Sequence, residues 1–253
     1  MLEALAQKVD EAARTASSIE QLSLSESFSL ADAYEIQRLS IDRRLQRSEK
    51  LAGYKLGFTS KAKMVQMGVD DLIWGRLTDN MIIEEGGDIS LADYVHPRVE
   101  PELCYLLKKP LSGTVTLLEA WSAVEAVAPA LEVIDSRYAN FKFSLEDVVA
   151  DNCSSSGFVV GPWHSPDIDV SNLGMILQVN GRDIAFGSSA AILGHPARSL
   201  LAAARCVGEV GEELKPGQVL MAGAATEAIA LQAGQAIRLE VDQLGSLGFS
   251  TKE

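Results

Sequence analysis

The chain has 253 residues, of which 47% are hydrophobic and 23% charged, an ordinary composition for a globular protein long enough to bury a large core. Its formal net charge of −13 disfavours nucleic acids and anionic membrane surfaces as partners, because both are bound through clustered lysine and arginine. No signal peptide is recognisable at the N-terminus, and no apolar run reaches the ~18 residues of a membrane span. We therefore expect a cytoplasmic protein with reduced cysteines. The three cysteines are too far apart in the sequence to form a metal-ligand pattern.

Helical spacing dominates the beginning of the chain. Apolar residues recur at helical intervals over residues 1–17, and a second helix is expected to begin at Ser29, a cap-like residue, and to continue to about Ser48. These two helices predict an N-terminal helical region over residues 1–50.

Short strand-like segments separated by glycine follow, and they predict a β-rich domain over residues 51–253. Asn180 and Gly181, between strand-like residues 175–179 and 182–186, give the strongest hairpin signal. Strands outnumber helices, so we expect an α+β fold and not a doubly wound sheet. Further strands are expected at residues 53–58, 98–107, 157–160, 218–222, 228–231 and 236–241, and helices at residues 117–127, 145–152 and 197–207.

Two glutamates, Glu100 and Glu102, are spaced so that their side chains share one face of an extended strand. Two carboxylates on one face of an acidic protein repel each other, and a hard divalent cation with oxygen ligands is the simplest compensation. The alternative is the solvated outer face of an edge strand. Glu132 favours the cation, because it lies in the apolar run 127–134, where an unpaired charge would be costly.

Six short motifs are distributed along the chain, at residues 53–60, 75–79, 96–102, 130–137, 150–154 and 193–196. In this order they resemble the hydratase and decarboxylase branch of the fumarylacetoacetate hydrolase superfamily, and the resemblance runs from about Ala31 to the C-terminus. Residues 60–69 and 134–143 look more like the decarboxylases of this branch than like its hydratases.

The resemblance implies a rolled, mixed β-sheet body with a helical N-terminal layer. It also implies a Mg²⁺ or Mn²⁺ ion held by Glu100, Glu102 and Glu132, a small dicarboxylate substrate, a homo-oligomer, and a complex with the hydratase of the same pathway. Pro101 departs from the family pattern, which usually has a residue with a backbone N–H there. Because proline removes a ladder donor, we expect an edge strand or a bulge at this point.

The implied reaction is the metal-dependent decarboxylation of 2-oxo-3-hexenedioate to 2-hydroxypenta-2,4-dienoate in the meta-cleavage catabolism of aromatic compounds. Hydration of 2-hydroxypenta-2,4-dienoate is the alternative, and a non-catalytic scaffold is a third possibility. Loss of CO₂ needs an electron sink for the developing dienolate, whereas hydration needs protonation at carbon and a positioned water.

Three further residues are expected around the substrate. Lys55 lies between apolar neighbours, so by spacing alone it is either a snorkelling surface residue or a buried functional one. The family motif places its ammonium at a substrate carboxylate or at the enolate oxygen. Asp79 is a turn cap by its local sequence, and by resemblance a proton carrier or an orienter of Lys55. Ser154 is expected to contact the substrate, although hydroxyls at helix ends often bind local backbone.

Other polar residues have weaker signals. His96 and His195 each precede a proline and have no metal-ligand partner at close spacing, so structural roles are expected for both. Cys153 has no histidine nearby in the sequence that would activate a nucleophile. Arg137 is expected to anchor a loop by ion pairing, with a contact to the substrate as the alternative.

Overall fold

The protein is represented by a computed structural model that describes residues 1–60 and 72–253. The part of the decarboxylase-like segment that follows Ser60 falls outside the described residues. Within the described part of the chain, no helix combines the length and apolar character that crossing a membrane requires.

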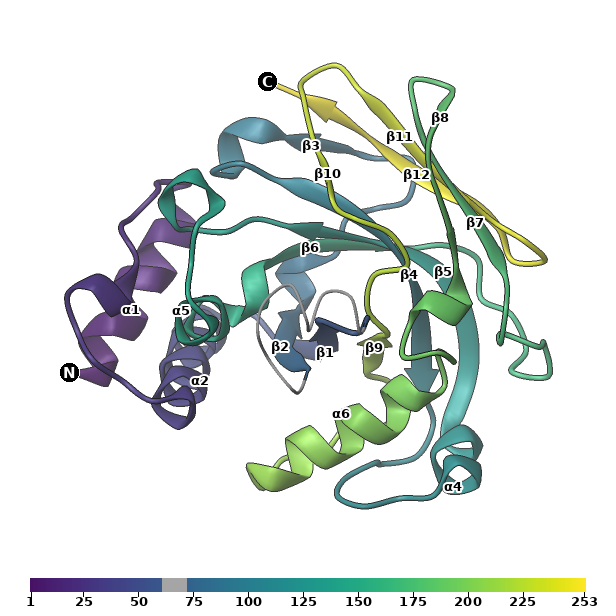
Figure 1. The fold of residues 1–253 in the computed structure, drawn as a ribbon, viewed down its shortest axis with the longest axis horizontal. Coiled ribbons are helices and arrows are strands. Elements are labelled where there is room, and N and C mark those ends of the chain that lie inside the picture. Colours follow the sequence, from purple (N-terminus) through teal and green to yellow (C-terminus); the bar gives the residue numbers. More distant parts are fainter. Residues whose placement is uncertain (61–71) are drawn as a thin grey trace.

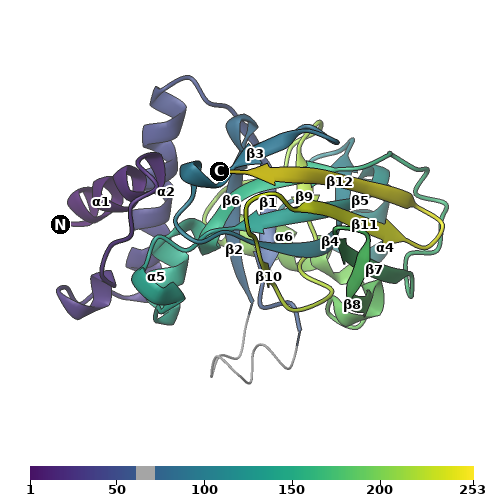
Figure 2. The same cartoon turned by 90° about the horizontal axis from the view of Figure 1, so that it is seen from above.

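Helices α1 (Leu2–Arg14) and α2 (Leu30–Gln46) pack against each other at the N-terminal side of the molecule (Figures 1 and 2). Ser29 caps α2 in a capping box with Asp32, as its sequence predicts. Gln37 connects this layer to the body, because its buried amide donates to the carbonyl oxygens of Trp74 and Val149. The short helix α5 (Leu145–Ala150) packs on α2.

A seven-stranded sheet forms the centre of the molecule, and its first strand begins at Leu51, after both N-terminal helices have ended. The strand order is β2-β1-β9-β4-β5-β6, with β10 paired to β4. The β1–β9 pair is parallel and the other pairs are antiparallel, so the sheet is mixed. Its strands are β1 (Leu51–Gly57), β2 (Ile73–Thr78), β4 (Arg98–Leu107), β5 (Val124–Ile134), β6 (Ser155–Val160), β9 (Val219–Met221) and β10 (Ile229–Ala230).

A second, five-stranded sheet in the order β3-β12-β11-β7-β8 lies over one side of the first (Figure 1). The predicted hairpin at Asn180 and Gly181 is confirmed, and both residues have the positive φ that its turn requires. Buried side chains from both sheets, such as Leu131 and Leu239, form one core between them. The strands are β3 (Asp88–Ser90), β7 (Gly174–Val179), β8 (Arg182–Ser188), β11 (Ala236–Val241) and β12 (Gly245–Lys252).

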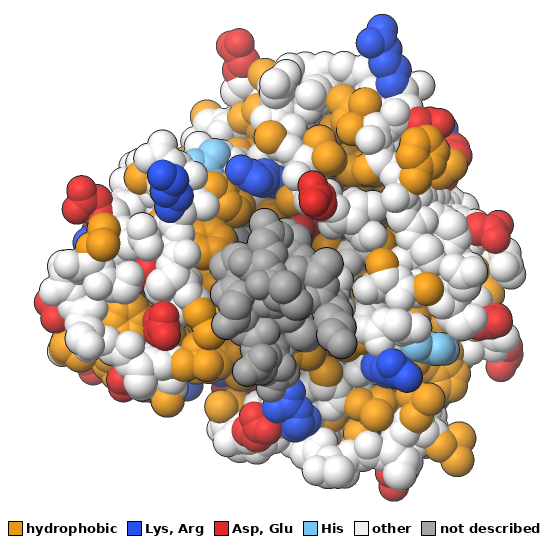
Figure 3. All heavy atoms as spheres, viewed as in Figure 1, with side chains coloured by type: hydrophobic (Ala, Val, Ile, Leu, Met, Phe, Trp, Pro, Cys, Tyr) orange, Lys and Arg blue, Asp and Glu red, His pale blue; other side chains and the backbone are white. Residues whose placement is uncertain are grey.

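Helices α4 (Leu117–Ser122) and α6 (Arg198–Glu209) lie at the edge of the body (Figure 1). The described residues also form the 3₁₀ turns Leu22–Leu24, Asp79–Met81, Leu91–Asp93, Ala139–Phe141, Asn152–Ser154 and Ser189–Ala191. Figure 3 shows side chains of both charges scattered around the face seen in Figure 1, with apolar side chains between them.

The α+β class and the mixed, curled sheet with an N-terminal helical layer are confirmed, but several element boundaries differ from the predictions. The helix expected over residues 117–127 ends at Ser122, and strand β5 begins at Val124. The alanine-rich sequence there has high helix propensity, which pairing with β4 overrides. The helix expected to reach residue 152 ends at Ala150, where left-handed residues follow.

Candidate metal centre and active site

The pairing of β4 with β5 brings together the three glutamates that the sequence singles out. Glu100 and Glu132 are directly opposite each other in the antiparallel register, and Glu102 lies two residues further along the same face. One carboxylate oxygen from each residue lies within 4.8 Å of those of the other two. All three side chains are buried, so the solvated edge-strand alternative is excluded.

Glu102 is the member of this cluster with an unsatisfied carboxylate oxygen. Its Oε2 accepts a hydrogen bond of 2.8 Å from the backbone N–H of Gly223, but its buried Oε1 has no hydrogen-bond partner in the described structure. Burial raises the pKa of Glu102 well above its usual range, and the charges of Glu132 and Glu100 raise it further. A buried, oxygen-only cluster of this kind fits a hard divalent cation such as Mg²⁺.

Lys55 lies on β1 and reaches the same cluster. Its Nζ is 3.1 Å from Oε1 and 3.2 Å from Oε2 of Glu132, and its side chain is buried, so it is not a snorkelling surface residue. Burial would lower the pKa of Lys55, but the neighbouring carboxylates, led by Glu132, outweigh this effect and raise it. Lys55 is therefore held as an ammonium ion beside the triad.

Pro101 does not disturb the strand that carries the glutamates. It is in regular register opposite Leu131, and the only register shift between β4 and β5 lies at Leu106 and Leu107. The Pro101 carbonyl accepts from Ala225 on the other side of β4, beyond the end of its pairing with β9. The expected bulge is absent at this point of the described ladder, and β4 lies inside the sheet and not at its edge. The missing N–H faces a loop, where no ladder hydrogen bond is lost.

A left-handed turn carries the third predicted contact, Ser154. Asn152, Cys153 and Ser154 have φ values of 50°, 53° and 60°, which are uncommon for residues other than glycine. The Asn152 side chain binds both the N–H and the C=O of Arg76, and the Cys153 thiol donates to the Trp74 carbonyl. The turn is thus fixed to β2, and it leaves the buried Ser154 hydroxyl without a hydrogen-bond partner among the described residues.

Arg137 supports this turn from the other side. Its guanidinium forms a buried ion pair with Asp151, and its backbone N–H also donates to that carboxylate. Arg137 further donates to the hydroxyl of Ser156, so it anchors the loop as the sequence predicts. Burial raises the pKa of Asp151 to about 6, although Arg137 acts in the opposite direction.

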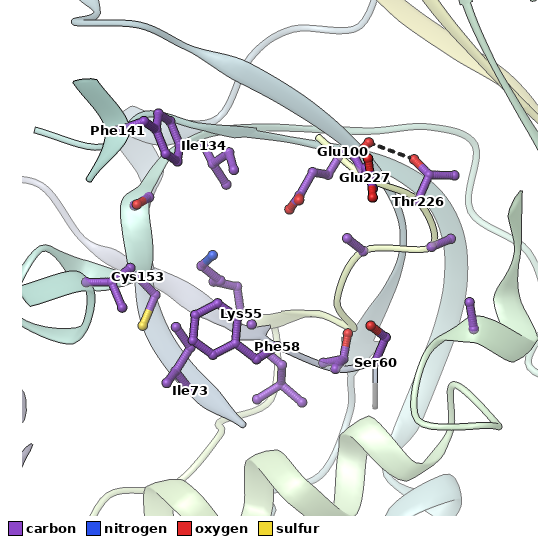
Figure 4. A pocket seen from close by; sticks show the side chains of 18 of the residues that line it. Lys55, Phe58, Ser60, Ile73, Glu100, Ile134, Phe141, Cys153, Thr226 and Glu227 are labelled. Atoms are coloured by element: carbon purple, nitrogen blue, oxygen red, sulfur yellow. Dashed lines mark hydrogen bonds between the residues drawn. The ribbon is translucent and has the colours of Figure 1, made fainter. Parts of the chain in front are cut away.

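A cavity of about 320 Å³ opens in front of these groups. Figure 4 shows Lys55 and Glu100 directed toward its middle, with Phe141 and Ile134 on one side of Glu100 and Thr226 and Glu227 on the other. Ser154 lines the cavity as well. The larger apolar side chains on its wall belong to Leu56, Phe58, Ile73, Ile134, Phe141, Phe143 and Val148.

Asp79 lies outside this cavity. It is exposed at the end of β2, where its carboxylate accepts from the backbone N–H of Lys50, and it does not line the cavity. In the β1–β2 pair, Lys55 is opposite Gly75, whereas Asp79 follows Thr78 at the far end. The geometry therefore supports the turn-cap alternative and not a proton carrier or an orienter of Lys55.

Two groups that position the site carry almost no sequence signal. Gly223 holds Glu102 through its N–H, has φ of 108°, and has no room for a Cβ, which would lie 2.2 Å from Oγ1 of Thr59. Phe141 enters the cavity wall from a loop, also with positive φ. Only the glycine could have been suspected from the sequence, and only as a turn residue.

Comparison with known proteins places this chain in a family. Residues 57–250 match the family model described as "Fumarylacetoacetate (FAA) hydrolase C-terminal". The chain belongs to the fumarylacetoacetate hydrolase family.

Individual relatives are similar over almost their whole length. A 4-oxalocrotonate decarboxylase from a Pseudomonas species is 60% identical over 98% of this chain and 96% of that protein. A 2-hydroxyhexa-2,4-dienoate hydratase from Comamonas testosteroni is 32% identical over 100% of this chain and 98% of its own. The structure of 4-oxalocrotonate decarboxylase from Pseudomonas putida G7, complexed with magnesium and adipate, gives a TM-score of 0.96 at 36% identity, covering 99% of this chain and 97% of that one.

Proposed function

We propose that this chain is a metal-dependent decarboxylase that converts 4-oxalocrotonate (2-oxo-3-hexenedioate) to 2-hydroxypenta-2,4-dienoate and CO₂. The observation that carries the proposal is the buried carboxylate triad, ion-paired to Lys55 at the wall of a cavity. The 60% identity to a 4-oxalocrotonate decarboxylase supports this choice among the reactions of the family.

Glu100, Glu102 and Glu132 would hold the cation, Mg²⁺ or Mn²⁺, and the orphaned Oε1 of Glu102 is the atom that most needs it. When bound, the cation would supply Lewis acidity at the 2-keto end of the substrate. The magnesium in the Pseudomonas putida G7 relative supports this assignment.

Lys55 would stabilise the charge that the reaction creates. When the bond between C5 and C6 of the substrate breaks, CO₂ leaves, and its electron pair moves through the alkene onto the 2-keto oxygen. The Lys55 ammonium, held beside Glu132 in a buried position, is preorganised to donate to that oxygen. The product is an enol, so no carbon atom has to be protonated.

Ser154 would contribute binding and orientation. Its hydroxyl is buried, lines the cavity and lacks a partner in the described structure, so donation to a substrate carboxylate would satisfy it. The apolar wall formed by residues such as Phe58 and Phe141 would keep water away from the reacting carbon atoms.

Hydration of 2-hydroxypenta-2,4-dienoate is the alternative activity, since hydratases are also similar to this chain, at 32% identity for the Comamonas testosteroni enzyme. A hydratase must protonate carbon and deliver a water molecule. Asp79, the residue expected to carry such a proton, lies outside the cavity. A purely structural scaffold is disfavoured by the intact triad and its lysine.

The experiment supplies the purified protein and Mg²⁺ with 4-oxalocrotonate and, separately, with 2-hydroxypenta-2,4-dienoate. We expect CO₂ release and accumulation of 2-hydroxypenta-2,4-dienoate from the first substrate. Conversion of the second substrate to 4-hydroxy-2-oxopentanoate, with no CO₂ from the first, would establish the hydratase instead.

Assembly and location are part of the same proposal. From the family resemblance we expect a cytoplasmic homo-oligomer that also associates with the hydratase acting on its product. Light scattering of the protein alone and after mixing with such a hydratase measures both associations.

A further inference from the structure

Gln37 is a residue of the N-terminal layer whose side chain is fixed by three partners. It lies on α2 and is fully buried. Its Nε2 donates to the carbonyl oxygens of Val149 and Trp74, at 2.9 and 3.1 Å, and its Oε1 accepts from Nη1 of Arg76 at 2.7 Å. Turning the amide over would direct its oxygen at two carbonyls and its N–H groups at a guanidinium. The partners therefore hold the amide in one orientation.

Two of these partners contact the segment that leads to Ser154. Val149 lies on α5, which ends just before the turn. The Trp74 carbonyl accepts not only from Gln37 but also from the thiol of Cys153, at 3.0 Å. Gln37 and the turn thus bind the same backbone oxygen of β2.

Arg76, the third partner, holds the first residue of the turn through its backbone. Its N–H donates to the side chain of Asn152, and its C=O accepts from the same side chain, both at 2.8 Å. On its other side the guanidinium is paired with Glu212 at 2.5 Å. Because Glu212 keeps Arg76 in place, a substitution of Gln37 should disturb the turn more than the strand.

The turn depends on such contacts, because β2 is the edge strand of its sheet and the backbone of residues 152–154 is left-handed. A left-handed backbone is costly for residues other than glycine, and it persists only where the surrounding structure imposes it. Helix α2 supplies this surrounding at two points. Gln37 binds the Trp74 carbonyl, and Tyr34 stacks on the Trp74 ring with 5.1 Å between ring centres.

The position of the turn matters for the reacting groups. Gly75 is opposite Lys55 in the β1–β2 pair, and the carbonyl oxygen of Asn152 lies 2.8 Å from the place that a Cβ of Gly75 would occupy. A displacement of the turn therefore moves Ser154 relative to Lys55. Gln37 itself is not among the described residues that line the cavity.

We propose that Gln37 is a positioning residue for substrate binding. It holds the turn in the conformation that presents the Ser154 hydroxyl to the cavity, and it acts through that hydroxyl without touching the substrate. The inference rests on the proposed function, because it takes a carboxylate of the substrate as the group that Ser154 binds.

The test separates KM from kcat. Gln37→Met keeps the length of the side chain but removes its hydrogen bonds. KM for 4-oxalocrotonate should rise about twofold to tenfold, as expected for loss of one neutral hydrogen bond, and kcat should change less than about twofold. A residue that only stabilised the fold would lower the amount of active enzyme, and with it the apparent kcat, without raising KM.

Combination with Ser154→Ala shows whether Gln37 acts through the hydroxyl. In the Ser154→Ala background, Gln37→Met should raise KM by less than about twofold, because the hydrogen bond that it positions is already absent. Fold-changes in KM that multiply in the double variant would overturn the inference.

Two further variants keep the result interpretable. Gln37→Glu retains an oxygen that accepts from Arg76, so it carries the test if Gln37→Met does not fold. Its carboxylate offers no N–H to the carbonyls of Val149 and Trp74, and KM should rise as in Gln37→Met. Gln46→Met, at an exposed position of the same helix, should leave KM and kcat unchanged. A wild-type KM in Gln37→Glu would overturn the inference.

Failure of the proposed function is recognised separately, as absence of CO₂ from 4-oxalocrotonate with the wild-type protein. The inference is then tested without turnover, by calorimetric titration of the magnesium-loaded proteins with adipate, an unreactive diacid. The Gln37 variants should bind adipate about twofold to tenfold more weakly than the wild type, and this loss should disappear in the Ser154→Ala background. Unchanged adipate affinity in the Gln37 variants would contradict the positioning role.

Discussion

Two regions of this protein place polar groups at one cavity by different means. The β4–β5 pair does so by regular register, since Glu100 and Glu132 are cross-strand partners and Glu102 follows at the strand period. The turn at residues 152–154 does so by irregular backbone, with three consecutive left-handed residues fixed by side-chain hydrogen bonds. The strands hold groups that bear charge, whereas the turn presents a neutral hydroxyl. We therefore expect large effects from changes in the strands and small effects from changes in the turn.

The largest effect is expected for Glu102→Gln, which keeps the shape of a buried ligand but removes its charge. Turnover should fall on the order of 10³-fold or more, because Lewis-acid catalysis supplies several kcal/mol. Mg²⁺ should raise the melting temperature of the wild type but not of the variant. In EDTA the variant should be at least as stable as the wild type, since it buries no unpaired carboxylate.

Glu125→Gln is the matched control, because Glu125 lies on β5 but is exposed and pairs only at the surface with Lys108. It should behave as wild type. A normal Mg²⁺-dependent increase in the melting temperature of Glu102→Gln would place the metal elsewhere.

Lys55→Met tests the other charged member of the strand site. Turnover should fall on the order of 10²-fold or more, as it does when a preorganised donor to developing charge is removed. The Mg²⁺-dependent increase in melting temperature should persist, because the three carboxylates remain. Lys50→Met, at an exposed position just before β1, provides the comparison. Unchanged kinetics in Lys55→Met would show that Lys55 only forms a structural ion pair with Glu132 and does not act in the reaction.

Ser154→Ala should have a smaller effect, since it removes one neutral hydrogen bond, worth about 0.5–1.5 kcal/mol. We expect KM for 4-oxalocrotonate to rise about twofold to tenfold, with kcat less affected. Steady-state kinetics beside Ser250→Ala, on β12 of the other sheet, measures this difference. A loss as large as that of Lys55→Met would contradict the division between strand and turn.

Asp151→Asn tests the buried ion pair with Arg137 that supports the turn, and the measured quantity is the free energy of unfolding as a function of pH. The pKa of Asp151 is raised by burial to about 6 in the folded protein, above its unfolded value of 3.8. A raised pKa gives a contribution that is present below about pH 4 and lost as the pH rises through about 6. In chemical denaturation the variant should lack this decline, although removing one partner of the buried pair lowers its stability overall. An identical slope in both proteins would exclude Asp151 as its source.

The smallest effect is expected for Asp79→Asn, whose side-chain oxygen can still accept from Lys50 at the surface. Turnover should stay within about twofold of wild type, as for other surface substitutions. A tenfold decrease would show that Asp79 takes part in the reaction.

The carboxylate triad on β4 and β5 could be predicted from the sequence, whereas the turn at residues 152–154 largely could not. Two-residue spacing places Glu100 and Glu102 on one face, and the apolar run around Glu132 signals a buried charge that needs compensation. The register that sets Glu132 opposite Glu100 depends on strand pairing, and the helix-favouring sequence before it concealed where β5 begins.

The left-handed residues could not be predicted, because none of residues 152–154 is glycine and their conformation comes from contacts with β2 and Arg137. The same holds for Phe141, whose ring is fixed by Arg98 and His96. Asp79 shows the opposite case. Its motif implies a role at the substrate, whereas its local sequence predicts the turn cap that its hydrogen bond with Lys50 supports.

Gly223 has a consequence for how this sequence can evolve. The group that holds Glu102 is a backbone amide, so no mutation can delete it directly, and any side chain at position 223 would collide with Thr59. In a mutational scan, position 223 should therefore be as intolerant as a metal ligand, although it performs no chemistry. Position 59 should accept only side chains that fit against the backbone of Gly223, as Thr59 does. In related sequences, the residues at positions 59 and 223 should therefore vary together. Such covariation would show that the contact between them is maintained because it supports the carboxylate triad.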